Sequence, residues 1–355
     1  MFNILILGGG KIGSLVACML AEHQDFKVIL ASQYFHYPMP SSILTIEVDI
    51  TKTKDISKRL RQYKIDAVIS CLPFFLNIQV ASICAESNTH YFDLTEDVEV
   101  TKQIMKLAKT SSAIFVPQCG IAPGFVNIVG EFFIPQFDKC QELRLRVGGL
   151  PQFTQNALKY ALTWSLDGLI NQYINPCTVI KNTQLIEEPA LEQCENITLD
   201  GIEYEAFNTS GGIGHLAKRY QHQVQELNYK TLRYPGHCEK IKFLLHDLGL
   251  KDDRDTLKHL LKNALPEVEQ DHVIVFVSAA GFKNKIWQEH HYYKKILPQK
   301  FQNQIWSAMQ IATASSVCVV VDLILHHQDH HQGLVLHEKI GYGDFMSNRF
   351  SQCFR

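Results

Sequence analysis

Residues 1–13 read MFNILILGGGKIG, and this stretch decides the fold of the first part of the chain. An apolar run, typical of a short buried strand, ends at the spacing G-x-G-x-x-G, and a helical pattern follows from Ser14 to Glu22. In that order the glycines allow a tight turn, a close approach of the backbone to a pyrophosphate, and close packing of helix on strand. The phosphates of a dinucleotide would lie at the positive end of the helix dipole. A turn of purely structural role is the alternative. The residues expected at the phosphates are Gly8, Gly10, Lys11, Ile12 and Gly13.

Strand and helix patterns alternate over the following hundred residues. Further strands are expected at 27–31, 42–48, 66–71, 90–94 and 113–117, and helices at 55–62, 77–87 and 98–110. Strands separated by helices of this length indicate βαβ units and a parallel sheet, whose ligands lie outside the carboxyl ends of the strands. We therefore predict an α/β fold with an N-terminal Rossmann-type parallel sheet, over residues 1–120.

The pattern changes after Pro123-Gly124. Polar and apolar residues alternate at 142–148, 198–207, 229–234 and 272–279, as they do in half-exposed antiparallel strands. This favours a second, α+β substrate domain over residues 121–304. A long apolar helix at 305–325 would open a C-terminal segment, 305–355, that returns to the first domain.

Composition excludes several classes of protein. Hydrophobic residues make up 46 %, charged residues 20 %, and the formal net charge is −2, which gives no long-range attraction to nucleic acid or anionic lipid. The apolar stretch 311–325 is shorter than the ~20 residues of a membrane span and contains Asp322, so we expect a buried helix and no membrane partner. Ten cysteines without a C-x-x-C pair favour free thiols and a cytoplasmic location.

The end of the second strand bears on the choice of cofactor. NAD sites place an acidic residue about 20 residues past the glycines, where it binds the ribose 2′-hydroxyl. Here Ser32 and Gln33 stand at that point. Without the carboxylate a 2′-phosphate is not repelled, but no arginine stands beside these residues to hold it. The sequence leans toward NADP(H), with NAD(H) as the alternative.

Seven further motifs follow in chain order. They are SCLPF at 70–74, YFDLT at 91–95, CGIAPGFVN at 119–127, VGGLP at 147–151, TWSLDG at 163–168, EAFNTSGG at 205–212 and KTLRYPGH at 230–237. Together they resemble the saccharopine dehydrogenase family, most closely its lysine 6-dehydrogenase-like branch. The resemblance implies a cofactor domain, a substrate domain and an active site between them. It also implies oxidation of an amino acid's C–N bond, or reduction of the imine, in a homo-oligomer.

The family's pattern also implies which residues complete the cofactor site. They follow the ends of the third, fourth and fifth strands, which is where a doubly wound sheet binds its ligands. By this resemblance Asp49 and Ile50 lie by the adenine, Cys71, Leu72, Pro73 and Phe74 line the nicotinamide ribose, and Leu94 and Thr95 lie at the next strand end.

Oxidation of an amine needs a base, because the substrate ammonium must lose a proton before hydride departs. His237 is the first candidate and Asp93 the second. The alternatives are a histidine that orients its own loop and an aspartate that caps a turn. Cys119, beside the Pro-Gly turn, is a further candidate at the substrate, with an inert buried thiol as its alternative.

An α-carboxylate needs a planar, bidentate partner, and Arg233 fits that role, unless it forms a structural salt bridge. Asn208 and Thr209 could hydrogen-bond the amino-acid substrate or cap a turn.

One departure from the family concerns the substrate. Glutamate-type enzymes of the family resemble W-S-x-R-G, whereas here Asp167 stands in place of the arginine. A carboxylate does not hold a second carboxylate at neutral pH but can hold an ammonium. This favours a substrate with one carboxylate and a distal amine, such as lysine, unless Asp167 caps the helix that follows.

The tract His326-His327-Gln328-Asp329-His330-His331 has i,i+4 histidine pairs that could hold zinc on a helix. Because such tracts are more often solvated, we predict no resident metal.

Two other functions remain open from the sequence. An imine reductase of polyamine or opine type would keep the scaffold and change the substrate. A non-catalytic dinucleotide-binding sensor would keep the fold and lose turnover.

Overall fold

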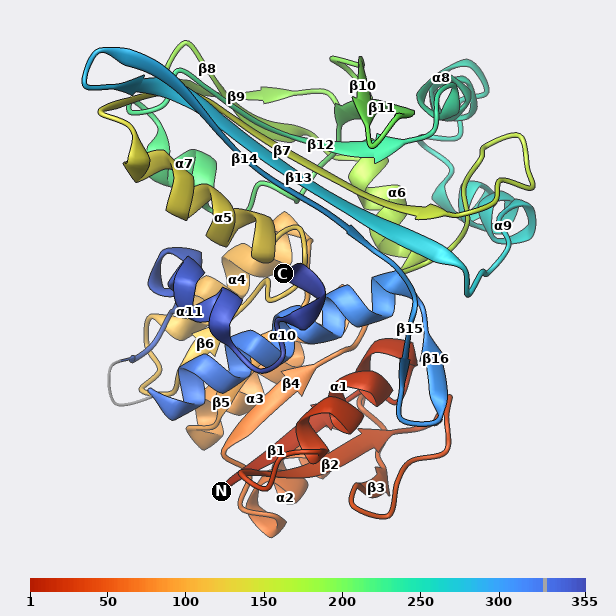
Figure 1. Cartoon of the computed structure of the whole chain (residues 1–355). Helices are drawn as coiled ribbons and strands as arrows, with labels where there is room; N and C mark the ends of the chain where they lie inside the picture. Colours follow the sequence, from red (N-terminus) through yellow and green to blue (C-terminus); the bar gives the residue numbers. More distant parts are fainter. Residues whose placement is uncertain (328–330) are drawn as a thin grey trace. The chain divides into compact units, whose positions relative to one another are not determined.

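The computed structural model describes residues 1–327 and 331–355 (Figure 1). The chain divides into two compact units, one of Met1–Phe125 with Gln310–Arg355 and one of Val126–Met309. The C-terminal segment thus belongs to the same unit as the glycine turn.

Unit 1 is built on a six-stranded sheet in the order β3-β2-β1-β4-β5-β6. Every neighbouring pair is parallel. This confirms the predicted Rossmann-type sheet. The strands are β1 (Phe2–Leu7), β2 (Phe26–Ser32), β3 (Leu44–Glu47), β4 (Ala67–Ser70), β5 (His90–Asp93) and β6 (Phe115–Val116). The helices are α1 (Lys11–Ala21), α2 (Thr53–Gln62), α3 (Asn77–Ser87), α4 (Val98–Ala108), α10 (Ala308–His326) and α11 (Tyr342–Ser347), with 3₁₀ turns at Phe74–Leu76, His337–Lys339 and Gln352–Phe354.

The strand register aligns the carboxyl ends that matter for binding. Leu7 at the end of β1 pairs with Ser70 at the end of β4, and Ser70 pairs with Asp93 at the end of β5. The loops that follow these three strands therefore leave the sheet at one edge. This edge is where a doubly wound sheet binds its ligands.

The core of unit 1 is apolar on both sheet faces, as a parallel sheet covered by helices requires. Ile4 to Leu7 and Ala67 to Ser70 are all buried. Among the described residues one helix, α10, is long and apolar enough to cross a membrane, but most of it is buried inside the folded chain, which is typical of a core helix.

The start of α10 differs from the prediction. The expected helix begins at residue 305, whereas α10 begins at Ala308 because β16 (Gln304–Trp306) pairs with β15 (Gln299–Phe301). The carboxylate of Asp271 accepts hydrogen bonds from the N–H groups of Ala308 and Met309 and so fixes where the helix begins.

Unit 2 contains a mixed sheet in the order β10-β11-β12-β7-β13-β14, with β8 pairing β12 and β9 pairing β8. Only the β12–β7 pair is parallel. The predicted α+β character is confirmed. The strands are β7 (Lys139–Pro151), β8 (Cys177–Lys181), β9 (Gln184–Glu188), β10 (Glu195–Leu199), β11 (Ile202–Asn208), β12 (Glu226–Arg233), β13 (Asp271–Lys283) and β14 (Ile286–Ile296). The helices are α5 (Phe125–Phe133), α6 (Leu166–Ile174), α7 (Leu216–Tyr220), α8 (His237–Lys242) and α9 (Arg254–Ala264), with a 3₁₀ turn at Ile134–Gln136 and a π-helical turn at Phe243–Asp247.

One expected strand of unit 2 is two strands. The segment 198–207 folds as the hairpin of β10 and β11, turning at Asp200 and Gly201, which both have positive φ. Asp-Gly supports this turn because both residues adopt the left-handed conformation readily.

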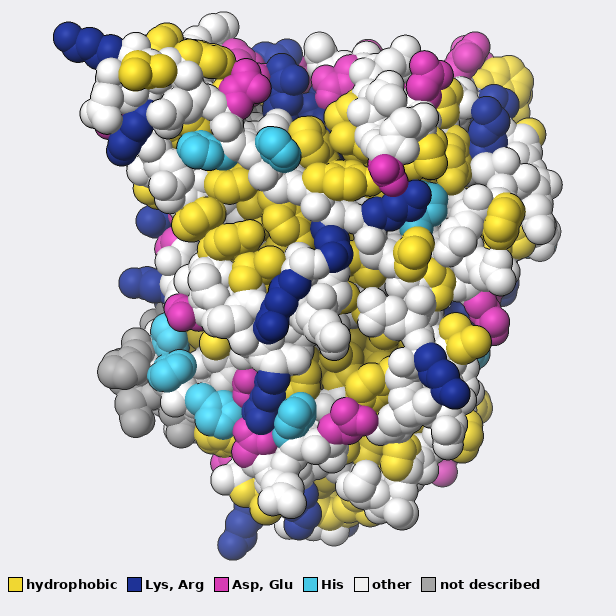
Figure 2. Space-filling model, viewed as in Figure 1, with side chains coloured by type: hydrophobic (Ala, Val, Ile, Leu, Met, Phe, Trp, Pro, Cys, Tyr) yellow, Lys and Arg dark blue, Asp and Glu magenta, His cyan; other side chains and the backbone are white. Residues whose placement is uncertain are grey.

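The core of unit 2 lies where α6, α8 and α9 pack on the sheet. Its largest buried members are aromatic and leucine side chains, including Tyr160, Tyr173, Tyr204, Phe207, Leu232 and Leu257. Figure 2 shows basic and acidic side chains interspersed over the face drawn, in line with the formal net charge of −2. All ten cysteines are free thiols.

Candidate active site

The glycines of the turn between β1 and α1 differ in their surroundings. Gly8 has φ of 108°, and a Cβ there would lie 2.8 Å from the carbonyl oxygen of Cys71. A Cβ at Gly13 would lie 1.9 Å from the carbonyl oxygen of Gly8. At Gly10 a Cβ would meet no atom within 4 Å. Gly8 and Gly13 thus serve chain packing, whereas Gly10 borders open space.

The amino end of α1 fits a pyrophosphate. Helical hydrogen bonding begins with the N–H of Ser14, which donates to the Gly10 carbonyl oxygen at 3.0 Å. The preceding N–H groups of Ile12 and Gly13 have no acceptor among the described residues, and the first turn holds no acidic side chain. Free N–H groups, the helix dipole and the open space at Gly10 together provide an anion site. Lys11 is the first residue of this helix.

The loops after β2 and β3 supply polar groups but no arginine. The Ser32 hydroxyl oxygen accepts a hydrogen bond from the N–H of Tyr34 at 3.3 Å, and Gln33 is exposed. Asp49 accepts hydrogen bonds from the hydroxyl and the N–H of Thr51, which lower the pKa of its carboxyl. Ile50 is buried.

The loops after β4 and β5 lie at the same sheet edge. The N–H of Cys71 donates to Leu7 O at 2.9 Å, and burial, with the charge of Asp93, raises the pKa of its thiol to about 12. Leu72 and Pro73 lead into the turn that begins at Phe74, and Leu94 and Thr95 follow Asp93 directly. The structure thus places all these predicted cofactor residues at strand ends, and their contacts with a cofactor stay predictions.

Asp93 is fully buried and holds its own loop together. Its carboxylate accepts hydrogen bonds from the Tyr91 hydroxyl at 2.8 Å, from Thr95 N at 2.9 Å and from Gln118 N at 3.0 Å. Burial raises the pKa of this carboxyl to about 6, although the three donors lower it. Cys119 donates its N–H to Asp93 O and its thiol to Val116 O, and burial raises the pKa of that thiol.

Arg233 ends β12 inside unit 2 and is 2 % exposed. Its Nε donates to the Tyr173 hydroxyl at 3.0 Å, and its Nη1 donates to Thr231 Oγ1 at 2.7 Å and to Leu232 O at 2.8 Å. The guanidinium carbon lies 4.5 Å from the centre of the Tyr160 ring. No carboxylate among the described residues pairs with this guanidinium, and its Nη2 has no acceptor there.

His237 begins α8 and is also buried. Its Nδ1 lies 2.7 Å from Leu158 O and its Nε2 lies 2.9 Å from the Tyr173 hydroxyl. Because Tyr173 accepts from Arg233, it donates its own proton to Nε2, and Nδ1–H donates to Leu158 O. Burial, with the charge of Arg233, lowers the pKa of His237 to about 3. The ring is neutral at neutral pH and both of its nitrogens are occupied.

The other predicted substrate residues do not gather around Arg233 in the same way. Asn208 donates its amide to Glu188 at 2.7 Å, whereas the buried Thr209 hydroxyl has no partner among the described residues. Asp167 bonds the ammonium of Lys258 at 2.7 and 2.8 Å on the surface. The side-chain cap of α6 is Ser165, which accepts from Gly168 N, and not Asp167.

Sequence reasoning missed three neighbours of this cluster. Tyr160 and Tyr173 contact Arg233 directly, and neither lies in a motif of recognised chemistry. Lys159 donates its ammonium to Pro235 O at 3.1 Å and has no acidic partner among the described residues. Its positive φ of 49°, uncommon for a residue with a Cβ, is a structural signal that the sequence does not carry.

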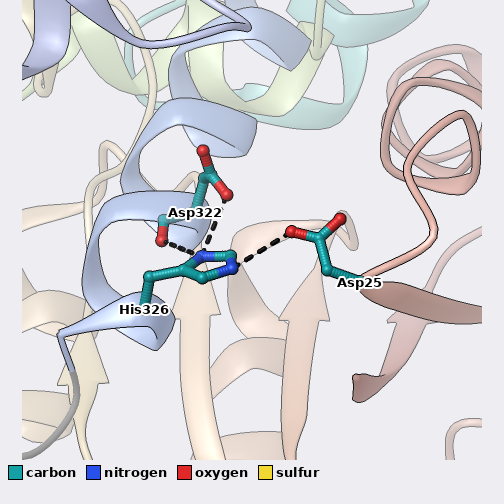
Figure 3. A group of neighbouring side chains, drawn as sticks. All are labelled: Asp25, Asp322 and His326. Carbon is teal, nitrogen blue, oxygen red and sulfur yellow. Dashed lines mark hydrogen bonds and ion pairs between the residues drawn. The ribbon is translucent and has the colours of Figure 1, made fainter.

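Another cluster has metal-like ligands, and an arginine bridges its two carboxylates. Figure 3 shows His326 between Asp25 and Asp322, with its Nε2 3.1 Å from Asp25 Oδ2 and its Nδ1 3.1 Å from Asp322 Oδ1. Nη2 of Arg349 lies 2.5 Å from an oxygen of each aspartate. Burial opposes ionisation of Asp25, but the hydrogen bond and charge of Arg349 and the charge of His326 lower its pKa. The cluster is a closed ionic network.

Of the predicted histidine tract, Gln328, Asp329 and His330 lie outside the described residues. The expected pair of His326 with His330 therefore has no structural description.

Comparison with known proteins gives a consistent family. Residues 4–113 match the saccharopine dehydrogenase NADP binding domain, and residues 120–348 match the saccharopine dehydrogenase C-terminal domain. The first of these matches confirms the lean toward NADP.

Two curated relatives and one solved structure agree with this family match. The mitochondrial alpha-aminoadipic semialdehyde synthase of Rattus norvegicus is 23 % identical over 282 residues, which cover 74 % of this chain and 30 % of that protein. The NADP(+), L-glutamate-forming saccharopine dehydrogenase of Schizosaccharomyces pombe is 21 % identical over 268 residues, 71 % of this chain and 58 % of that one. The chain thus spans less than two thirds of either relative. The apo saccharopine dehydrogenase (L-Glu forming) of Saccharomyces cerevisiae has the same fold, with a TM-score of 0.80, 16 % identity, and coverage of 98 % of this chain and 96 % of that one.

The glycine turn, the parallel sheet with its mixed-sheet partner, and a family match over more than half of the residues lead to one assignment. The chain belongs to the saccharopine dehydrogenase family.

Proposed function

We propose that the protein is an NADP-dependent oxidoreductase that acts on the C–N bond of an amino acid, lysine-like or saccharopine-like. The observation that carries the proposal is the guanidinium of Arg233, 2 % exposed, with no carboxylate partner among the described residues. A buried cation without a counter-ion is costly, and a carboxylate of the substrate would supply the missing charge.

The contacts of Arg233 define how it would hold a carboxylate. Nε and Nη1 are bound within the protein, which fixes the guanidinium plane, and Nη2 is left to donate. Tyr173 links Arg233 to His237, whose Nδ1 lies 2.7 Å from a backbone carbonyl oxygen. His237 then acts as a positioning residue, through Tyr173.

The glycine turn of unit 1 would hold the cofactor. The N–H groups of Ile12 and Gly13 would bind its pyrophosphate, and the space at Gly10 would admit it. When bound, NADP supplies the nicotinamide carbon that accepts hydride from the substrate or returns it to an imine.

The charged side chains of unit 2 bear on which substrate of this class the protein takes. Asp167 does not favour a substrate ammonium, because its carboxylate already pairs with the ammonium of Lys258. Lys159, next to the Tyr160 that stacks on Arg233, offers a second cation without an acidic partner among the described residues. This favours a second candidate function, an imine reductase of opine type whose substrate carries two carboxylates.

The test is the change in nicotinamide absorbance with purified protein, either cofactor, and lysine, ornithine, diaminopimelate or saccharopine. Turnover that requires NADP supports the proposal, and Arg233→Met should lower kcat/KM by about 100-fold or more. The matched control is Arg61→Met, at an exposed arginine of α2. Cofactor binding without turnover on any substrate would favour the sensor.

We also propose a cytoplasmic homo-oligomer. The free thiols fit a reducing compartment. Light scattering of the purified protein measures the number of subunits, and a monomer at all concentrations would contradict the proposal.

A further inference from the structure

The loop after β5 is held rigidly at both ends. At its start the Asp93 carboxylate accepts from Thr95 N, which closes a turn. At its end Asp97 caps α4 by accepting from Glu99 N and Val100 N. Glu96 lies between these two anchors, at the sheet edge where β1, β4 and β5 end in register. Its position is therefore fixed by the backbone and not by its own side chain.

The carboxylate of Glu96 has no partner from another described residue. It is half-buried, and among the described residues no cation pairs with it and no other residue's group donates a hydrogen bond to it. Its carboxylate accepts a hydrogen bond from its own N–H. The charged groups that face it are Asp97 and Asp93, both acidic. Burial first, and then the repulsion of these two acids, raise the pKa of Glu96 to about 7.

The other candidates for proton transfer are already hydrogen-bonded within the protein. Asp93 accepts three hydrogen bonds, and both nitrogens of His237 are bound. The Cys119 thiol is buried and donates to a backbone carbonyl oxygen. Glu96 is the acid of this sheet edge whose oxygens are available to a ligand.

We propose that Glu96 is the catalytic base that takes the proton from the substrate nitrogen, an assignment that rests on the proposed function. In the oxidation direction its carboxylate removes one proton from R–CH₂–NH₃⁺, which leaves the amine lone pair. As hydride leaves carbon for NADP⁺, that lone pair forms the C=N bond of R–CH=NH₂⁺. The protonated Glu96 then returns its proton to solvent. In the reverse direction the same group protonates the amine product.

The experiment compares Glu96→Gln with wild type and with Glu99→Gln, an exposed glutamate in the first turn of α4. Glu96→Gln should lower kcat/KM for amine oxidation by about 100-fold or more and should remove the acidic limb of its pH profile. Glu99→Gln should retain both. The affinity for NADPH, measured by fluorescence without substrate, should stay within about twofold in both variants.

A second readout does not depend on turnover. In ¹³C-carboxyl NMR, the glutamate signal that is missing from Glu96→Gln should titrate with a midpoint near neutral pH. A midpoint at an ordinary glutamate pKa, an unchanged pH profile, or a parallel loss of NADPH binding would overturn the assignment while leaving the proposed function standing. A wild-type protein that oxidises none of the amines would overturn both.

Discussion

The hydroxyl group of Tyr173 lies 2.9 Å from Nε2 of His237. It accepts from Nε of Arg233 at 3.0 Å, so its own proton goes to the histidine. The order of donors then runs from Arg233 to Tyr173, from Tyr173 to His237 and from His237 to Leu158 O. A buried guanidinium is held in one orientation by groups that are all neutral.

Tyr173→Phe removes the acceptor for Arg233 Nε and leaves that N–H buried. Loss of a hydrogen bond to a charged group costs about 1.5–3 kcal/mol, so KM for the amino acid should rise by about 10- to 100-fold. The affinity for NADPH should not change. The matched control is Tyr234→Phe, whose hydroxyl donates to Pro151 O and not to Arg233. Equal effects of both variants on KM would show that the link to Arg233 is not specific.

Gly13→Ala and Gly10→Ala should fail in different ways. A Cβ at Gly13 would lie 1.9 Å from Gly8 O, so this variant should lose more than about 3 kcal/mol of stability. A Cβ at Gly10 meets no protein atom within 4 Å. The free energy of unfolding of Gly10→Ala should therefore lie within about 0.5 kcal/mol of the wild-type value. This variant should nevertheless bind NADPH more weakly, because the methyl group fills the space for the pyrophosphate. Denaturant unfolding and fluorescence titration measure the two effects. Normal NADPH affinity in Gly10→Ala would mean that the phosphates lie elsewhere.

His237 should make the protein sensitive to acid. Its pKa is about 3 when folded against 6.5 as the ordinary value, so between these values the unfolded chain binds a proton that the folded chain does not. The stabilisation is complete above pH 6.5 and is lost as pH falls toward 3, with a slope of up to about 1.4 kcal/mol per pH unit. His237→Asn, which keeps a donor for Leu158 O, should flatten this slope. Burial lowers the pKa of His272 to about 4. This histidine therefore contributes a pH dependence of stability of the same sign, which His237→Asn retains. His259→Asn, at an exposed residue of α9, is the control. A slope that survives in His237→Asn would contradict the neutral, buried ring.

Asp167→Asn should have little effect on catalysis. The carboxylate of Asp167 pairs with Lys258 on the surface, and exposed pairs contribute about 0–1 kcal/mol. Neither kcat/KM nor the free energy of unfolding should change beyond that amount. A large rise in KM for a diamine-like substrate, absent from Lys258→Met, would restore Asp167 as a ligand of the substrate ammonium.

The fold was predictable where short stretches of sequence carry its signals. The apolar run that ends at Leu7 and the glycines that follow it predict β1 and α1 within a few residues. The hairpin at Asp200 was missed because alternation continues across the turn, and the start of α10 was missed because a distant carboxylate, that of Asp271, fixes it.

The site was less predictable than the fold, since its partners lie far apart in the sequence. Arg233 was predicted as a substrate ligand from its motif, but Tyr173, which orients it, lies 60 residues away. Whether a polar residue is free to act depends on such contacts. His237 and Asp93 carry suitable chemistry, yet both are hydrogen-bonded to other residues. Among the described residues no other residue donates to the carboxylate of Glu96, and no motif marks it.

Arg349 should be the residue that keeps a metal out of the Asp25, Asp322 and His326 cluster. It supplies a positive charge between two neighbouring carboxylates, so Arg349→Ala should lower the free energy of unfolding by about 1–3 kcal/mol. Because the arginine is one third exposed, solvent keeps the loss below that of a fully buried pair. Arg61→Ala, at an exposed arginine of α2, is the control and should change stability by less than about 0.5 kcal/mol.

Removal of Arg349 also leaves ligand atoms of Asp25, Asp322 and His326 within 4.8 Å of one another, which suits a divalent cation. Zinc should therefore raise the Tm of Arg349→Ala and have no such effect on wild type. An equal rise in wild type would show that zinc enters the cluster despite the arginine. No rise in either protein would contradict the prediction that the arginine is what keeps a metal out of the cluster.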